Sequence, residues 1–178
     1  MNLEPIAPPD FKLDVFSAWE KAFLLTCGDF QVMKFNTMTI GWGAYGIMWG
    51  KPFVQVVVRP TRYTYQFMEE YDTFTVTGFP PEFDRTLDFL GTVSGRKRDK
   101  IQEAGLTPIA AQIVEAPAFA EATLVIECKK IYFHDLEPAH FLATYIPQAY
   151  MNDYHRVYYG EILGIWGTSE YINPSTRG

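Results

Sequence analysis

Cationic and hydroxyl side chains follow the most strand-like run of the sequence. The run FVQVVVR (53–59) is rich in β-branched residues and ends in Arg59, and Arg62, Tyr63 and Thr64 come shortly after it. A guanidinium group can hold a phosphate through two parallel hydrogen bonds, and a threonine hydroxyl adds a neutral donor. These residues are therefore candidates for a phosphate site. Surface arginines at a solvated strand end explain the same pattern about equally well.

A second cationic cluster lies in the stretch SGRKRDK (94–100). Four of the fifteen Lys and Arg residues fall within five positions here, in a chain whose formal net charge is −6. Ser94 and the adjacent glycine offer a hydroxyl and approachable backbone N–H groups ahead of an expected helix, and Arg96 and Lys100 add positive charge. The stretch therefore suits an anion, although a solvated charged turn is the more usual explanation of such a run.

The segment NTMTIGW (36–42) is typical of a strand with two different faces. Alternation places Asn36, Met38, Ile40 and Trp42 on one face, and Thr37, Thr39 and Gly41 on the other. The second face is small and polar, so a planar ring could lie against the backbone there and accept hydrogen bonds from N–H groups. An edge strand with a solvated threonine face is an equally good alternative.

His155, in the sequence Asp153–His155, is the candidate for a polar contact to a ligand. An imidazole can donate or accept a hydrogen bond and can change its charge near neutral pH, whereas a histidine held by backbone groups has only a structural role. His134 and His140 have no acidic or cysteine partner at the spacing of metal ligands, so no metal site is expected. The sequence also contains no G-x-S-x-G nucleophile motif.

Gly41, Gly43 and Gly46 reproduce the G-x-G-x-x-G spacing of a dinucleotide-binding turn. That turn requires a helix that begins at its last glycine, and Gly50 and Pro52 leave no room for one. We therefore reject this interpretation. The glycines are expected to form a bend or bulge between two strands, or to allow a close approach of the backbone to a ligand.

Composition narrows the function further. The 178 residues are 48% hydrophobic and 20% charged, which indicates a globular chain, and we expect a single domain over residues 1–178 with its core at about 20–166. The pI near 5.0 disfavours general nucleic-acid binding. No signal peptide and no run of about 18 apolar residues is visible, so no membrane span is expected. Cys27 and Cys128 form no CxxC motif and are expected to be reduced thiols of a cytoplasmic protein.

Hydrophobic periodicity predicts more strands than helices. Strands are expected at 22–26, 31–35, 37–42, 53–59, 73–77, 122–133 and 154–166, and helices at 62–71, at 82–90 and in a short segment ending near Glu103. Because strands and helices do not alternate regularly, a mostly antiparallel barrel with helical insertions fits better than a doubly wound sheet. Residues 1–13 are expected to form an arm, 134–150 a loop with a helical turn, and 167–178 a polar tail.

Seven short motifs, taken in order, resemble the flavin reductase-like family, the FMN-binding split barrels that include flavoredoxin. They are NTMTIGW (36–42), WGKP (49–52), VRPTRYT (58–64), GTVSGR (91–96) with DK (99–100), GLTP (105–108), LVIEC (124–128), and DYH (153–155) with GEI (160–162). Each motif alone is weak, but their common order over residues 20–165 is specific. The resemblance implies a six-stranded antiparallel split β-barrel, mostly β with short helical insertions. It also implies a homodimer that holds FMN near the subunit interface.

The resemblance also assigns roles to individual residues. The isoalloxazine would be contacted, largely through backbone groups, by Thr37, Met38, Thr39 and Ile40, with Gly41 and Trp42 following them. The ribityl and phosphate part would be reached by Arg59, Arg62, Tyr63 and Thr64. Further anion contacts would come from Ser94, Arg96 and Lys100. His155 would lie near the exposed flavin face, where the nicotinamide of a co-substrate approaches.

Two functions are compatible with this resemblance. The first is an NAD(P)H-dependent flavin reductase, in which hydride passes from NADH or NADPH to FMN. The alternative is a flavoredoxin-type electron carrier, which keeps FMN tightly bound and exchanges electrons with a partner protein. The chemistry belongs to the flavin in both cases, so no side-chain nucleophile or acid–base pair is required.

Overall fold

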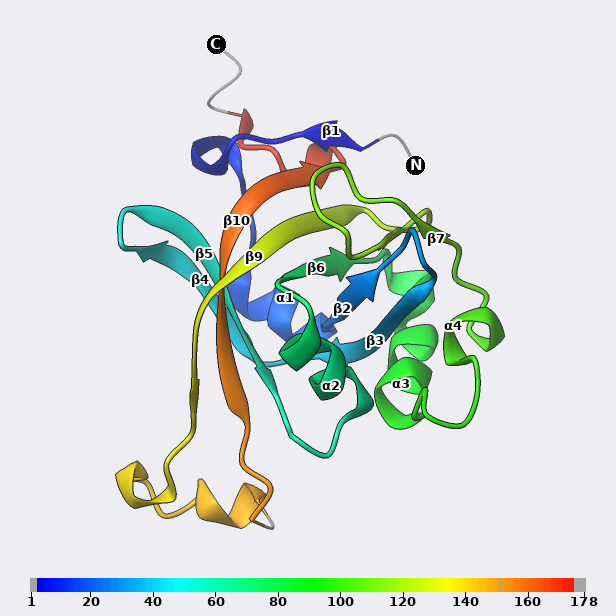
Figure 1. Cartoon of the computed structure of the whole chain (residues 1–178). Coiled ribbons are helices and arrows are strands. Elements are labelled where there is room, and N and C mark those ends of the chain that lie inside the picture. Colours follow the sequence, from blue (N-terminus) through cyan, green and yellow to red (C-terminus); the bar gives the residue numbers. More distant parts are fainter. Residues whose placement is uncertain (1–2, 151, 175–178) are drawn as a thin grey trace.

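An antiparallel sheet of eight strands forms the centre of the structure (Figure 1). The structure, a computed structural model, describes residues 3–150 and 152–174. Along the sheet the order is β3 (Lys34–Ile40), β2 (Phe23–Asp29), β6 (Thr73–Gly78), β9 (Leu124–Asp135), β10 (Arg156–Gly167), β5 (Lys51–Val58) and β4 (Gly43–Met48). The short β1 (Glu4–Pro5) pairs with the end of β10, and β7 (Pro108–Ile109) and β8 (Ala118–Phe119) form a separate pair.

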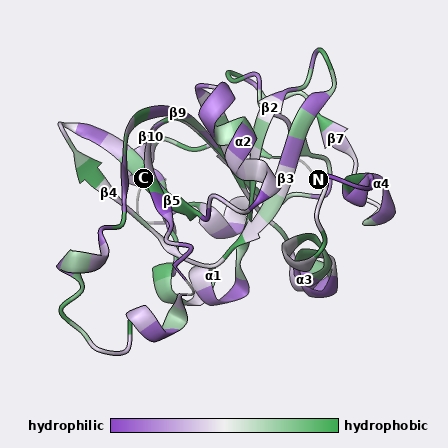
Figure 2. Ribbon diagram, turned by 60° about the horizontal axis from the view of Figure 1, so that its bottom comes forward, coloured by the Kyte–Doolittle hydropathy of each residue, from purple (hydrophilic) through white to green (hydrophobic). Residues whose placement is uncertain are grey.

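Four α-helices interrupt the strands: α1 (Val15–Lys21), α2 (Tyr63–Glu70), α3 (Asp84–Thr92) and α4 (Lys100–Glu103). Short 3₁₀ turns occur at Pro8–Asp10, Pro81–Phe83, Pro138–His140, Pro147–Ala149 and Ser169–Tyr171. α3 is fixed to β3 by a hydrogen bond of 2.5 Å from Thr39 Oγ1 to the carbonyl oxygen of Leu87. In Figure 2, hydrophobic and hydrophilic segments alternate along α3, as expected for a helix that buries one side.

Both faces of β2 are buried. Leu25 packs in the main core with Phe74 of β6, whereas Leu24 packs in a second cluster with Leu87 and Leu90 of α3. This explains why β2 begins with the unbroken apolar run Phe23–Leu25 rather than with an alternating pattern, since a strand covered on both sides has no solvent-facing positions. The sheet therefore holds α3 in place, and this fixes the position at which the following turn, residues 93–99, begins.

β9 and β10 are the longest strands and form a hairpin that extends well beyond the other strands (Figure 1). The far end of this hairpin carries the turns Pro138–His140 and Pro147–Ala149. Arg156 joins the two strands where this far end begins, by hydrogen bonds of 2.7 and 2.8 Å to the carboxylate of Asp135. The chain returns from this hairpin directly into His155.

The structure confirms the mostly β, antiparallel architecture and the helices expected at 62–71 and 82–90. The strands expected at 31–35 and 37–42 are wrong in one respect, because they form the single strand β3 after a tight turn at 30–33. When these two are counted as one strand, the sequence predicted six strands of the sheet. The two strands that it did not predict are β1 and β4, which bring the observed number to eight. Helix α1 was not predicted, although Asp14 accepts a hydrogen bond from the Ser17 backbone N–H at its start. The polar tail expected at 167–178 lies partly outside the described residues.

The G-x-G-x-x-G glycines belong to a strand, and no helix begins at Gly46. Gly43 and Gly46 lie in β4, where they make room for neighbouring rings. A Cβ atom on Gly43 would lie 2.2 Å from the Trp19 ring, and one on Gly46 would lie 3.0 Å from the Phe53 ring. Ring packing, not phosphate binding, therefore accounts for these two glycines.

None of the helices in the described part of the chain combines the length and hydrophobicity of a membrane span. Within residues 3–150 and 152–174, no three His, Cys, Asp or Glu side chains gather as metal ligands would.

Candidate functional site

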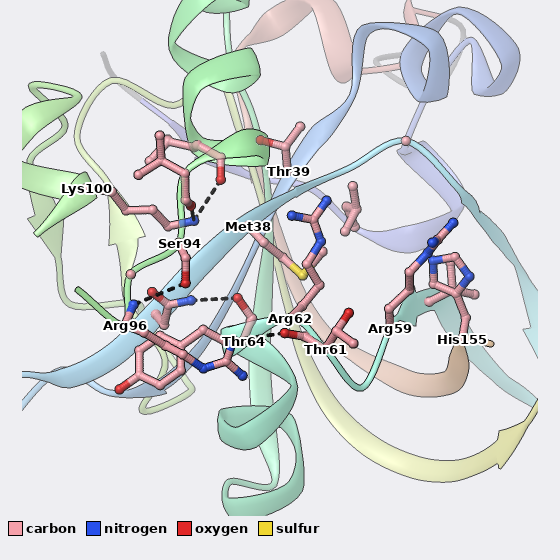
Figure 3. A pocket seen from close by; sticks show the side chains of 18 of the residues that line it. Met38, Thr39, Arg59, Thr61, Arg62, Thr64, Ser94, Arg96, Lys100 and His155 are labelled. Carbon is pink, nitrogen blue, oxygen red and sulfur yellow. Dashed lines mark hydrogen bonds between the residues drawn. The ribbon is translucent and has the colours of Figure 1, made fainter. Parts of the chain in front are cut away.

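A cavity of about 570 Å³ opens where β3 meets the start of α2 (Figure 3). Its walls come from β3 and the residues after it, from the end of β5 through the start of α2, from the segment between α3 and α4, and from the residues before β10. The lining residues are Asn36, Met38, Thr39, Ile40, Gly41, Trp42, Val57, Arg59, Thr61, Arg62, Tyr63, Thr64, Leu90, Val93, Ser94, Gly95, Arg96, Lys100, Asp153 and His155. The volume lies within the roughly 300–1,000 Å³ of small-molecule sites.

Thirteen of the fourteen residues predicted for the site line this one cavity. They come from separate parts of the sequence, so the fold brings the three predicted clusters and His155 together. The residues are Met38, Thr39, Ile40, Gly41, Trp42, Arg59, Arg62, Tyr63, Thr64, Ser94, Arg96, Lys100 and His155.

Thr37 is the predicted residue that does not line the cavity. Its side chain is fully buried, and its hydroxyl donates to the carbonyl oxygen of Leu25 at 3.2 Å and lies 2.9 Å from the Thr26 hydroxyl. Thr39 is bound to α3. The alternative of a solvated threonine face is therefore wrong, because β2 and α3 cover the side of β3 that carries these hydroxyls.

Three arginines of the cavity are held by backbone carbonyl oxygens. The hydrogen bonds run from Arg62 Nη1 to Gly91 at 2.9 Å, from Arg96 Nη1 to Thr61 at 2.9 Å, and from Arg59 Nη2 to Ala149 at 3.2 Å. Within the described residues, none of the three forms an ion pair with a carboxylate. A carbonyl oxygen orients a guanidinium without neutralising it, so the cavity keeps its positive charge.

Two of these arginines also lie over aromatic rings. Arg96 lies 5.3 Å from the centre of the Tyr63 ring, and Arg59 lies 5.2 Å from that of Tyr150. Such cation–π contacts restrict the side chain without consuming its charge. Both guanidinium groups are therefore oriented before an anion arrives.

Lys100 is buried, with 4% of its surface exposed. Its Nζ donates to the carbonyl oxygens of Leu90 at 2.7 Å and Val93 at 3.0 Å, and so closes the C-terminal end of α3. Burial and, to a smaller extent, the nearby charge of Arg62 together lower its pKa to about 8. The ammonium therefore carries its charge at neutral pH and loses it in mildly alkaline solution.

The turn at Ser94 packs directly on β3. A Cβ atom on Gly95 would lie 2.3 Å from Asn36 Oδ1, so this position admits only glycine without movement. Asn36 is itself buried and donates from Nδ2 to Thr64 Oγ1 at 2.7 Å. Asn36 thus joins the strand to the hydroxyl at the start of α2, and it holds the Ser94 turn against both.

His155 closes the other end of the cavity. Its Nδ1 lies 3.0 Å from the Tyr150 hydroxyl, and its ring centre lies 5.1 Å from that of Trp42. Burial lowers the pKa of His155 to about 4, and the Arg59 charge acts in the same direction. The imidazole is therefore neutral near pH 7 and can exchange a hydrogen bond with a ligand without changing its charge.

The two ends of the cavity differ in character (Figure 3). Ser94, Arg96 and Lys100 lie at one end, and His155 lies at the other with Arg59 beside it. Arg62 lies between them, since its charge acts on both Lys100 and His155. Arg59, predicted to reach the ribityl and phosphate part of the ligand, lines the same cavity on the side of His155.

Sequence reasoning missed several lining residues. Thr61 and Asp153 hold the segment before β10 against the β5–α2 loop, through a hydrogen bond of 2.6 Å from the Thr61 hydroxyl to the Asp153 carboxylate. The adjacency of Asn36 and Met38 on one strand face was a usable signal for Asn36. The apolar residues Leu90 and Val93 carried no comparable signal, because only the packing of α3 brings them to the cavity.

The family model described as "Flavin reductase like domain" matches residues 22–174. The chain belongs to the flavin reductase-like family. The match covers strands β2 to β10 and therefore every residue that lines the cavity. Among solved structures, this flavin reductase-like chain is similar to the flavoredoxin of Desulfovibrio vulgaris (Miyazaki F). The two are 26% identical with a TM-score of 0.64, and the match covers 84% of this chain and 70% of the other.

Two further solved structures share the fold. One is an FMN-binding domain of a flavin reductase-like enzyme from Shewanella baltica OS155, with 17% identity, a TM-score of 0.67, and 97% and 81% of the two chains covered. The other is the NADH:FAD oxidoreductase SgcE6 of Streptomyces globisporus, with 15% identity, a TM-score of 0.62, and 81% and 73% covered.

Two archaeal proteins match this flavin reductase-like chain by sequence. An uncharacterised protein of Aeropyrum pernix is 33% identical over 45% of this chain, and one of Archaeoglobus fulgidus is 26% identical over 62%. The chain spans about a third of the first relative and three fifths of the second, at 31% and 60%.

The cavity fits a flavin by its donor set and its walls. Arg96 and Lys100 at one end and Arg62 in the middle supply positive charge without a carboxylate partner among the described residues. Met38, Ile40, Val57, Leu90 and Val93 give the cavity apolar walls for a flat ring. A ligand with a ring system and a phosphate at opposite ends matches this distribution.

Proposed function

We propose that the protein is an NAD(P)H-dependent flavin reductase that binds FMN in the cavity beside β3. The observation that carries this proposal is the arrangement of the cavity itself. Cations that form no ion pair within the described residues lie from one end of the cavity to its middle, apolar side chains line the walls, and a neutral histidine lies at the other end. Bound FMN supplies the redox chemistry, since its ring accepts a hydride from reduced nicotinamide.

The protein's own residues bind and orient the ligand in this proposal. Arg62, Arg96 and Lys100 bind the phosphate, together with the hydroxyl groups of Thr64 and Ser94. Charge-assisted hydrogen bonds from guanidinium to phosphate are stronger than neutral ones, and their planar geometry fixes the direction of the ligand. Because two of the arginines already have backbone or ring contacts, little side-chain order is lost on binding.

The wall of β3 from Met38 to Gly41 orients the ring. Gly41 has no side chain and is exposed, which lets a planar group approach the backbone. Backbone N–H groups near the pyrimidine edge of the ring would stabilise negative charge there without reorganising.

His155 and Arg59 act at the nicotinamide end in this proposal. His155 stays neutral, so it can offer a hydrogen bond to a carboxamide group at neutral pH. Arg59 lies beside it and would attract the phosphates of NADH or NADPH. Trp42, whose side chain is 53% exposed, lies beside the imidazole, with 5.1 Å between the two ring centres.

A flavoredoxin-type electron carrier is the second candidate. The similarity to the Desulfovibrio flavoredoxin favours it, since that is the match with the highest identity among the three structures described above. A carrier would keep FMN bound and take electrons from a protein partner. Reduction of the bound flavin by NADH or NADPH distinguishes the two candidates, because only the reductase requires it.

We further propose that a second copy of this chain covers an apolar surface on the two hairpins. Ile47 and Trp49 at the β4–β5 turn are 71% and 65% exposed, and Tyr132 of β9 is 49% exposed. The Trp49 ring lies 6.0 Å from that of Tyr132, so the two hairpins present one continuous patch. Exposed apolar clusters of this kind mark interaction sites.

Binding of flavin tests the proposal at its base. The purified protein should be yellow or should quench the fluorescence of added FMN at one equivalent per chain. Colourless protein that also fails to bind added FMN would remove both the reductase and the carrier.

A further inference from the structure

Tyr150 forms a hydrogen bond with the imidazole of His155. Its hydroxyl lies 3.0 Å from Nδ1, and no other group within residues 3–150 and 152–174 bonds to either ring nitrogen. Nε2 therefore has no protein partner in this part of the chain. Tyr150 does not line the cavity, so it can act on a ligand only through the lining residues that it contacts, His155 and Arg59.

The end of the β9–β10 hairpin holds the Tyr150 ring in place. The ring stacks on Phe141, with 6.0 Å between the ring centres and 8° between the planes, and it lies 4.9 Å from the Tyr154 ring. The backbone N–H of Tyr150 donates to the carbonyl oxygen of Pro147 at 3.1 Å. Because these contacts restrict the ring, its hydroxyl keeps its position relative to His155.

Arg59 adds a positive charge beside this ring. Its guanidinium lies 5.2 Å from the centre of the Tyr150 ring and donates to the carbonyl oxygen of Ala149 at 3.2 Å. Burial raises the pKa of Tyr150, and the Arg59 charge opposes that rise only in part. The phenol therefore keeps its hydrogen at neutral pH and can donate it.

The hydrogen bond from Tyr150 decides which nitrogen of His155 carries a hydrogen. The pKa of His155, which burial and neighbouring positive charge lower to about 4, leaves the imidazole neutral with a hydrogen on only one nitrogen. That nitrogen is set by the bond that the other one makes. A phenol is a better donor than an imidazole N–H, and in the reverse pairing the phenol hydrogen would have no acceptor among the described residues. Donation from Tyr150 to Nδ1 is thus favoured, and it leaves the hydrogen on Nε2.

We propose that Tyr150 is a positioning residue that holds the hydrogen of His155 on Nε2, so that the imidazole donates to the carbonyl oxygen of the nicotinamide carboxamide. This inference rests on the proposed function, because it takes the histidine end of the cavity as the nicotinamide site. Tyr150 acts only through His155, which touches the ligand. The amide nitrogen of the carboxamide makes no bond to this histidine.

A fixed donor at Nε2 selects ligands by their acceptor. His155 is 9% exposed, so water does not readily replace a missing partner. A buried donor that loses its acceptor costs binding free energy, and a site built around such a donor rejects ligands that lack the matching oxygen. The histidine end of the cavity therefore distinguishes a carbonyl oxygen from a poorer acceptor at the same position.

Nitrogen-15 NMR of FMN-loaded protein labelled at histidine measures the tautomer, since a ring nitrogen with a hydrogen resonates apart from one without. The chain has three histidines, and the signals lost in His155→Gln identify this one. Nε2 should carry the hydrogen in the unsubstituted protein, whereas Tyr150→Phe should show it shared between the two nitrogens. A hydrogen on Nδ1 in the unsubstituted protein, or unchanged signals in Tyr150→Phe, would overturn the inference.

Tyr154→Phe is the matched control for Tyr150→Phe. It removes one hydroxyl from the same aromatic cluster, and Tyr154 contacts both Phe141 and Tyr150 without bonding to His155. The His155 signals should stay unchanged in this variant. If Tyr154→Phe moved them as far as Tyr150→Phe does, the packing of the cluster would account for the effect and the positioning role would fall.

Three oxidised dinucleotides of the NAD or NADP series, titrated calorimetrically into FMN-loaded protein, test the contact with the ligand. The first has the natural carboxamide. The acetylpyridine analogue keeps the carbonyl oxygen but has a methyl group in place of the amide nitrogen, and it should bind within about twofold of the natural dinucleotide. The thionicotinamide analogue keeps the nitrogen but has sulfur, a weak acceptor, in place of oxygen. It should bind about 2- to 10-fold more weakly, and Tyr150→Phe should reduce this difference to less than about twofold.

The reverse order of the two analogues would show that His155 accepts from the amide nitrogen. That result, or equal affinities for all three dinucleotides, would overturn the inference and leave the proposed function intact. Failure of all three to bind to protein shown to contain FMN would instead overturn the reductase and, with it, the ligand assigned to His155.

Discussion

Asn36 donates a hydrogen bond of 2.7 Å from its buried side-chain amide to the hydroxyl of Thr64. This contact joins an edge strand of the sheet to the first turn of α2 across 28 positions of sequence. It fixes the distance between the wall that would hold a flavin ring and a hydroxyl that would hold its phosphate. The geometry of the cavity therefore depends on Asn36, an uncharged residue.

Replacing Asn36 tests this dependence. Asn36→Leu removes the donor and leaves a buried hydroxyl without its partner, at a cost of about 1–3 kcal/mol. For a chain of this size we expect the melting temperature to fall by about 2–10 °C and the affinity for FMN to fall about tenfold. Thr64→Ser keeps the hydroxyl and is the control. Unchanged FMN affinity in Asn36→Leu would show that the contact does not position the site.

Arg62 should act on the phosphate rather than on the ring. Loss of one charge-assisted contact costs about 1.5–3 kcal/mol, so Arg62→Ala should weaken FMN about 10- to 100-fold. Riboflavin, which has no phosphate, should lose less than about threefold by the same titration. Arg85→Ala removes a cation outside the cavity and should change neither affinity. Equal losses for FMN and riboflavin in Arg62→Ala would contradict the assignment.

Lys100 should make FMN binding depend on pH. Its pKa of about 8 means that the ammonium is charged below that pH and neutral above it. The affinity for FMN should therefore be highest below pH 8 and should fall as the pH rises through that value. Because bound phosphate favours the charged amine, the midpoint should shift upward in the complex. Fluorescence titrations from pH 7 to 9.5 measure this.

Riboflavin is the internal control for Lys100, since its affinity should stay constant over the same range. Lys100→Met should bind FMN weakly at every pH and should lose the dependence. A wild-type protein whose FMN and riboflavin affinities change in parallel would show that another group titrates.

His155 should contribute to the acid sensitivity of the fold. Its pKa is about 4 in the folded protein and near 6.5 in an unfolded chain, so between these values the unfolded state binds more protons. Stability should therefore fall as the pH drops from 6.5 towards 4, by about 2 kcal/mol from this residue. Urea unfolding at several pH values should show a smaller decrease for His155→Gln. Identical decreases in both proteins would contradict the buried, neutral state of this imidazole.

The apolar patch on the hairpins predicts a dimer. Light scattering after size-exclusion chromatography should give twice the chain mass for the unsubstituted protein. Ile47→Asp with Trp49→Asp places two charges on the exposed β4–β5 turn and should give a monomer that keeps its fold, as judged by circular dichroism. Lys97→Asp, on the turn between α3 and α4, is the control. A dimer that survives the double substitution would place the interface elsewhere.

Much of the fold was readable because strand periodicity and turn residues act locally. β5, β6, β9 and β10 and the helices α2 and α3 follow from β-branched runs, breaking prolines and helical spacing. β4 could not be predicted from the sequence, because its glycines interrupt the alternation of apolar and polar residues that marks a strand. Its strand conformation depends on pairing with β5, which the local sequence does not show. Helix α1 was missed because seven residues give too few turns for a clear period.

The site was predictable in its parts but not in its internal arrangement. Residue chemistry and motif order identified thirteen lining residues before any contact was known. They did not show that Thr37 faces β2, that Arg59 lies beside His155, or that Lys100 closes a helix. Each of these three arrangements depends on which side of a strand or turn is covered by a segment distant in the sequence. The local sequence does not contain that information.

Anaerobic rapid mixing of FMN-loaded protein with NADH, and separately with NADPH, tests the central proposal most directly. A flavin reductase should lose the visible absorbance of oxidised flavin with at least one of the two donors, at a rate that rises with donor concentration. The same mixing with Arg59→Ala should require more donor, because this arginine lies at the nicotinamide end. Flavin that stays fully oxidised with both donors, in protein shown to contain FMN, would contradict the reductase and leave the electron carrier.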